Sequence, residues 1–68
     1  MENPRNTNII IEELHDLNIV IEQAKKLVEK YPNDFAIQMM LQQDEQRRKK
    51  LLKELHLSLS FYFYEQAA

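Results

Sequence analysis

A chain of 68 residues forms one small domain at most, and a domain of this size buries only roughly 60% of its unfolded surface. The chain has no glycine, which excludes phosphate-binding loops such as the P-loop, and no cysteine, which excludes disulfides and thiolate chemistry. Its net charge of −2 gives no overall field that favours nucleic acid or a membrane surface.

Residues 1–7 form a polar lead-in, MENPRNT, which lacks the apolar core of a signal peptide. No apolar run elsewhere approaches the ~20 residues that a membrane-spanning helix needs. We therefore expect a cytoplasmic protein without a membrane span.

The first predicted helix covers about residues 8–30. Its apolar residues alternate spacings of four and three, as in a coiled coil, and are Ile10, Leu14, Leu17, Ile21, Ala24, Val28 and Tyr31. Val20 and Leu27 widen this stripe, which suits a helix of a bundle with more than one neighbour. Asn6, Thr7 or Asn8 supplies the side-chain oxygen that caps the start of the helix.

A short turn over residues 31–33 follows, because Pro32 lacks an N–H and disfavours helical geometry at Tyr31. Asn33 or Asp34 then caps a second helix, predicted over about residues 34–54. So short a connection folds the two helices back on each other as an antiparallel, coiled-coil-like hairpin. In such a hairpin, residue i lies beside about residue 65 − i.

The second helix has an interrupted apolar stripe. Its stripe positions are Ile37, Leu41, Asp44, Arg48, Leu51 and Leu55, and the stretch QQDEQRRKK contains no apolar residue. Arg48 and Asp44 then face Leu17 and Ile21, which we expect to be poorly covered. A second copy of the chain would cover them, so we predict a homo-oligomer, with a dimer that forms a four-helix bundle favoured. Leu17, Val20 and Ile21 are its predicted interface.

Residues 55–68 form an amphipathic aromatic tail. The stretch LHLSLSFYFY alternates apolar and polar residues with the period of a β-strand, and we predict an extended or strand-like tail. The alternative is that the tail continues the second helix. In both cases its apolar side needs a partner, so Leu59, Phe61 and Phe63 complete the predicted interface. Residues 55–64 are also the predicted contact for another protein.

A basic run consists of Arg47, Arg48, Lys49, Lys50 and Lys53. Our interpretation is that acidic side chains of the first helix, such as Asp16 and Glu12, pair with it inside the hairpin. The alternative is a nucleic-acid contact through these five residues. The run has no interleaved aromatic residues, which such contacts often use.

The sequence predicts no catalytic site, metal site or cofactor. Glu12 and His15 have the spacing of a carboxylate–histidine metal motif, but the apolar stripe places them on the outer face of the helix. No nucleophile stands beside a base. We therefore expect a mainly α, non-catalytic, self-associating interaction module, or the oligomerising part of a larger protein or assembly. The alternative is a small nucleic-acid-binding, antitoxin-like regulator that uses the basic run.

Overall fold

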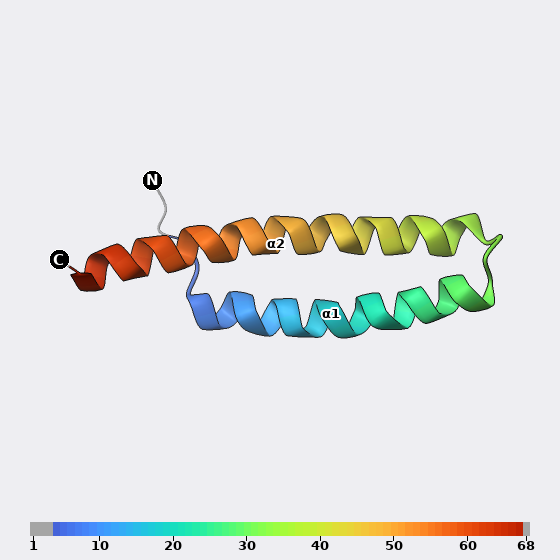
Figure 1. Ribbon diagram of the computed structural model, residues 1–68, viewed down its shortest axis with the longest axis horizontal. Helices are drawn as coiled ribbons and strands as arrows, with labels where there is room; N and C mark the ends of the chain where they lie inside the picture. The colour runs from blue at the N-terminus through green and yellow to red at the C-terminus, as the bar shows by residue number, and fades with distance from the viewer. Residues whose placement is uncertain (1–3, 68) are drawn as a thin grey trace.

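The computed structural model describes residues 4–67, which form two helices packed against each other as an antiparallel hairpin (Figure 1). Helix α1 spans Thr7–Lys30 and contains 24 residues, and helix α2 spans Phe35–Ala67 and contains 33 residues. The molecule is a rod with extents of 53 × 20 × 13 Å. The predicted helical hairpin is thus confirmed.

Local side chains set where each helix begins and ends. The side chain of Asn6 caps α1, with its Oδ1 accepting a hydrogen bond from the Asn8 N–H at 2.8 Å. Helix α1 ends before Pro32, and Asp34 Oδ1 then caps α2 by accepting from the Ile37 N–H at 3.2 Å. No residue of the described chain has a positive φ, so this turn needs no glycine.

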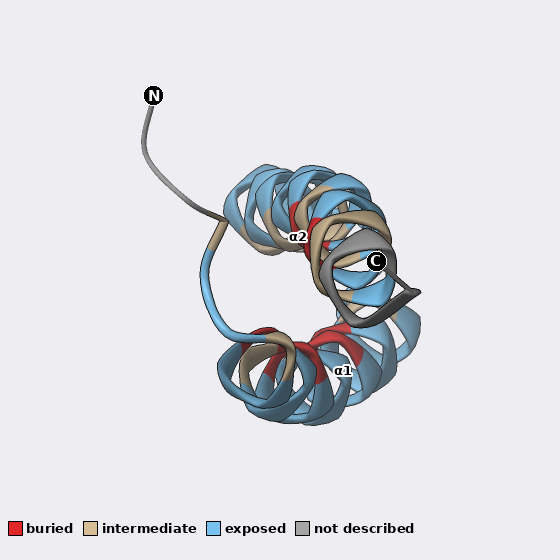
Figure 2. Cartoon of the chain, turned by 90° about the vertical axis from the view of Figure 1, so that its left-hand side faces the viewer, coloured by how far each residue is buried: buried red, intermediate tan, exposed pale blue. Residues whose placement is uncertain are grey.

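The core lies along the line where the two helices meet, where Figure 2 shows the buried positions facing each other. Its apolar residues all lie on one stripe of α1 or at the middle of α2: Ile10, Leu14, Leu17, Ile21, Ala24 and Leu51. Leu41 and Leu55 pack against this cluster and are half-buried. The core therefore follows α1 from Ile10 to Ala24 and does not reach its last six residues.

The prediction that α2 leaves Leu17 and Ile21 poorly covered is wrong. Leu17 is only 6% exposed and Ile21 is 0% exposed in the single chain. The side chains expected at their level, Asp44 and Arg48, are themselves half-buried. We attribute part of this burial to Arg48, because the aliphatic stem of an arginine can cover apolar surface.

The preferred prediction of an extended tail is also wrong, and the alternative holds. Helix α2 continues without a break from the predicted end at residue 54 to Ala67, and the described chain contains no strand. A helix satisfies its backbone groups internally, whereas a lone strand leaves them without partners. The lead-in also gives this part of α2 something to pack against, since residues 4–6 run beside it (Figures 1 and 2). Residues 1–3 and 68 lie outside the described chain.

Candidate protein–protein interface

A polar cluster on one side of the hairpin ties the lead-in to both helices. Arg5 donates through Nη1 to Glu13 Oε1 at 2.8 Å and through Nη2 to Glu54 Oε2 at 2.8 Å, and its Nε also bonds the Glu54 carboxylate. One guanidinium therefore joins a carboxylate of α1 to a carboxylate of α2. We call Arg5, Thr7, Glu13, Glu54 and Ser58 the clasp.

The hydroxyl of Ser58 is the buried centre of the clasp, with the residue 0% exposed. Its Oγ donates to the carbonyl oxygen of Arg5 at 2.7 Å and lies 2.8 Å from Thr7 Oγ1. Because a serine hydroxyl has one proton and the carbonyl can only accept, Thr7 is the donor in the second bond. Tyr62 Oη extends the same contact by donating to the carbonyl oxygen of Pro4 at 3.4 Å.

The charged groups of the clasp shift each other's pKa values towards the charged forms. The hydrogen bonds from Arg5 hold the pKa of the Glu13 carboxyl below its ordinary value, and the positive charge of Arg47 acts in the same direction. The same donor lowers the pKa of the Glu54 carboxyl. The bonds to these two carboxylates raise the pKa of the Arg5 guanidinium. All three groups therefore stay charged at neutral pH.

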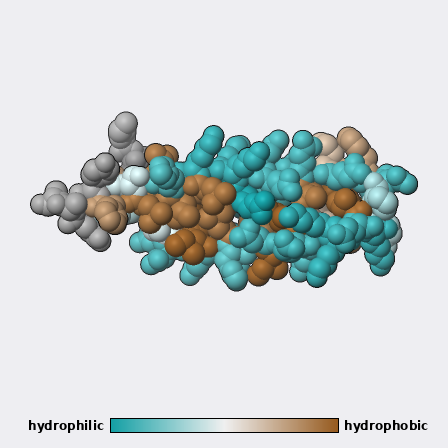
Figure 3. All heavy atoms as spheres, viewed as in Figure 1, coloured by the Kyte–Doolittle hydropathy of each residue, from teal (hydrophilic) through white to brown (hydrophobic). Residues whose placement is uncertain are grey.

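The side of the hairpin opposite the clasp carries exposed apolar residues. Residues i and i+2 of a helix point about 200° apart. Ile11 therefore points away from the side to which Glu13 points, and Leu52 points away from the side to which Glu54 points. Leu59 and Phe63 follow Leu52 by seven and eleven residues, which returns them to the same side. We call Ile11, Leu52, Leu59 and Phe63 the front stripe. Figure 3 shows apolar surface gathered over the C-terminal part of α2 and the beginning of α1.

The front stripe reaches past the end of the hairpin. Ser58 bonds Thr7, the first residue of α1, so residues 59–67 of α2 extend beyond α1. We call residues 59–67 the overhang, and nine helical residues make it roughly 14 Å long. On it, Leu59 is 48% exposed and Phe63 is 76% exposed. Phe63, the most exposed residue of the stripe, therefore has no second helix of its own chain beside it.

The structure separates the predicted interface residues. Leu17 and Ile21 are core residues, and Val20, 44% exposed, lines a shallow hollow with Glu13 and Arg47 on the clasp side. Leu59 and Phe63 share the front face. Phe61 points to the opposite side, because it is two helical positions from each of them. A strand would have placed all three tail residues on one face, and the helix does not.

The basic run is divided among several sides of α2. Arg48 donates to Asn18 Oδ1 at 3.3 Å, whereas Lys49, Lys50 and Lys53 are exposed. The ion pairs among the described side chains join Arg5 to its two glutamates and Lys25 to Glu22. The predicted pairing of the lysines with acidic residues of α1 is therefore not formed among those side chains.

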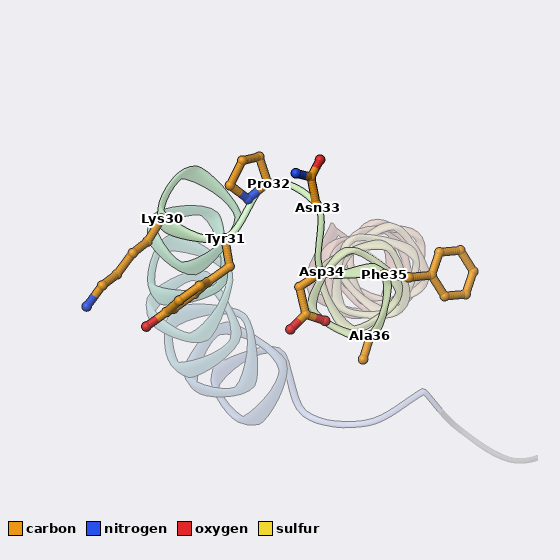
Figure 4. Close-up of a pocket in the computed structure, with 7 residues that line it drawn as sticks. All are labelled: Lys30, Tyr31, Pro32, Asn33, Asp34, Phe35 and Ala36. Carbon is orange, nitrogen blue, oxygen red and sulfur yellow. The ribbon is translucent and has the colours of Figure 1, made fainter.

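The side chains that line the hollow at the turn do not converge on a common point. Its lining is Lys30, Tyr31, Pro32, Asn33, Asp34, Phe35 and Ala36. Figure 4 shows that these side chains spread outward, with the Lys30 amine, the Asp34 carboxylate and the Phe35 ring pointing in different directions. Within the described residues, no group of three or more His, Cys, Asp or Glu side chains is placed to hold a metal ion.

Sequence reasoning assigned none of the five clasp residues to a contact between the lead-in and the two helices. An arginine in a polar lead-in was the one available signal for the clasp.

Comparison with protein-family models, curated proteins and solved structures found no match to this chain. None of the described helices is both long enough and apolar enough to cross a membrane.

Proposed function

We propose that this chain is a non-catalytic interaction module that associates with a second copy of itself. The observation that supports this proposal is the front stripe, whose four large apolar side chains are each about half exposed or more. Soluble monomers rarely leave contiguous apolar surface of this kind in water. A hairpin this small also has a modest core, which association would enlarge.

The lead-in already covers the clasp side of the hairpin, which supports association through the front face. The lead-in covers the clasp side with hydrogen bonds and ion pairs, and those groups have their partners within the chain. The front face offers apolar side chains without such partners. Association through the front face would therefore bury apolar surface and break no hydrogen bond of the clasp.

The test compares Leu59→Glu with Leu57→Glu by size-exclusion chromatography and light scattering. Leu57 is 64% exposed, and it lies two helical positions from Leu59 and so off the front face. At tens of micromolar we expect wild type and Leu57→Glu to be oligomeric, and Leu59→Glu to be monomeric with unchanged helicity. A monomeric wild type at this concentration would refute the proposal.

One observation favours the second candidate function, binding of nucleic acid. Lys49, Lys50 and Lys53 are exposed, and they lie within about 100° of each other on the outer side of α2. Such a strip can contact phosphates without disturbing the core. Fluorescence anisotropy with a labelled duplex tests it. Binding that weakens with salt and is lost in Lys49→Gln with Lys53→Gln would favour this candidate, and no binding at physiological salt would exclude it.

A further inference from the structure

We propose that two copies pack front face to front face in antiparallel orientation, about a two-fold axis that passes near Leu59. The overhang of each α2 then covers the other copy where Ile11 and Leu52 are exposed. This inference rests on the proposed self-association and adds its geometry. Three observations support it.

The first observation is that the apolar residues of the overhang are self-complementary. A two-fold interface brings the same patch of both copies together, so residues at equal distances on either side of the axis must suit each other. Leu55 and Phe63 lie four residues before and four residues after Leu59. An antiparallel pair centred on Leu59 therefore places Leu59 beside its own copy and Leu55 beside Phe63. Leu55 is half-buried at the inner edge of the front stripe.

The second observation is the position of the basic run. Parallel packing would align the five positive charges between Arg47 and Lys53 with the same five charges of the other copy. In the antiparallel arrangement the nearest pair is Lys53 with its own copy. Each Lys53 is six residues from the axis, so the two are about 18 Å apart along the helices. That separation exceeds the Debye length of about 8 Å at physiological salt, so the repulsion is largely screened.

The third observation is the unequal length of the helices. In a parallel dimer the two overhangs would lie side by side, and neither would contact an α1 helix. In the antiparallel dimer each overhang lies on a surface made by both helices of the other copy. Stable interfaces bury about 800 Å² per partner, and this arrangement buries more of the front stripe than contact between the overhangs alone.

The contact ends where the front face becomes polar. With the axis near Leu59, the last residues of α2 reach about the level of Leu51 in the other copy. Arg48 and Asn18, which bond each other, lie beyond that level and stay in water. The contact therefore ends before Arg48 and leaves its bond to Asn18 intact.

Single-cysteine variants test the geometry cleanly, because the chain contains no native cysteine. The experiment oxidises each variant with diamide or joins it with a short bismaleimide, and measures covalent dimer by mass spectrometry. We expect Leu59→Cys to cross-link with itself. We expect Leu55→Cys and Phe63→Cys to cross-link when mixed, and each much less when alone. Val20→Cys, on the clasp side, is the exposed control and should stay single.

The outcomes separate this inference from the proposed function. Light scattering that shows a monomer defeats both. A dimer in which Phe63→Cys and Leu55→Cys each cross-link efficiently alone is parallel and overturns the inference only. A dimer that cross-links through Val20→Cys and not through Leu59→Cys uses the clasp side, and also overturns the inference while leaving self-association intact.

Discussion

Replacement of Ser58 by alanine measures what the clasp contributes to the fold. The change removes two hydrogen bonds, at 2.7 Å to the Arg5 carbonyl and at 2.8 Å to Thr7, from a side chain that is fully buried. A hydrogen bond of this kind contributes about 1 kcal/mol, so the loss is about 2 kcal/mol. Alanine favours a helix over serine by about 0.5 kcal/mol, which offsets part of it. We expect Ser58→Ala to lower the free energy of unfolding by about 1.5 kcal/mol.

The matched control is Ser60→Ala, which makes the same chemical change two residues away. Ser60 is half-buried and takes no part in the clasp, so its replacement should be neutral or stabilise by a few tenths of a kcal/mol. Thermal and urea unfolding, followed by circular dichroism at one protein concentration, compare the variants. For a domain of this size a loss of about 1.5 kcal/mol corresponds to roughly 10 °C in Tm. If the two variants unfold together, the clasp contributes nothing measurable and the reasoning fails.

Two further predictions concern the core and the charges of the clasp. Leu51→Ala should lower the free energy of unfolding by about 2–3 kcal/mol and leave much of the chain unfolded. Leu57→Ala, on the exposed side, should change it by less than about 0.5 kcal/mol. Urea unfolding measures both variants, and equal effects would contradict the assigned core. Because Arg5 lowers the pKa of Glu13 and of Glu54, their stabilisation is fully present above the unfolded pKa of about 4.3 and is lost as pH falls through the lower folded values. Urea midpoints measured from neutral to acid pH should therefore fall less steeply in Arg5→Gln than in wild type, and parallel curves would show that the clasp charges are not linked to folding.

The hairpin itself could be predicted because its signals are local. Heptad spacing marks the stripe of α1, and Pro32 with Asp34 marks the turn. The short turn then fixes which residues lie side by side. The bonds from Ser58 to Thr7 and from Arg48 to Asn18 join residues whose numbers sum to 65 and 66, close to the expected pairing. Geometry that follows from covalent connection is therefore recoverable from the sequence.

The helical tail and the clasp could not be predicted in the same way. The leucines and aromatic residues after Leu55 fit both a strand and a helix, so periodicity alone leaves the two open. The deciding partners are the backbone carbonyls of Pro4 and Arg5, which accept from Tyr62 and Ser58. Every residue carries such a carbonyl, so no pattern of side chains indicates which of them is used.

The polar middle of α2 bears on where the chain can associate. Residues 42–50 contain no apolar side chain, which suggested from the sequence that α1 stays uncovered. In the structure Leu17 and Ile21 are buried, with the half-buried Asp44 and Arg48 at their level. The middle of the hairpin therefore needs no second chain, and its front face is polar. On the front face, apolar surface stays exposed at the end of the hairpin that carries the overhang. We therefore expect a partner that makes apolar contacts on the front face to bind at that end. In the proposed dimer the second copy points the other way, which keeps the two basic runs apart.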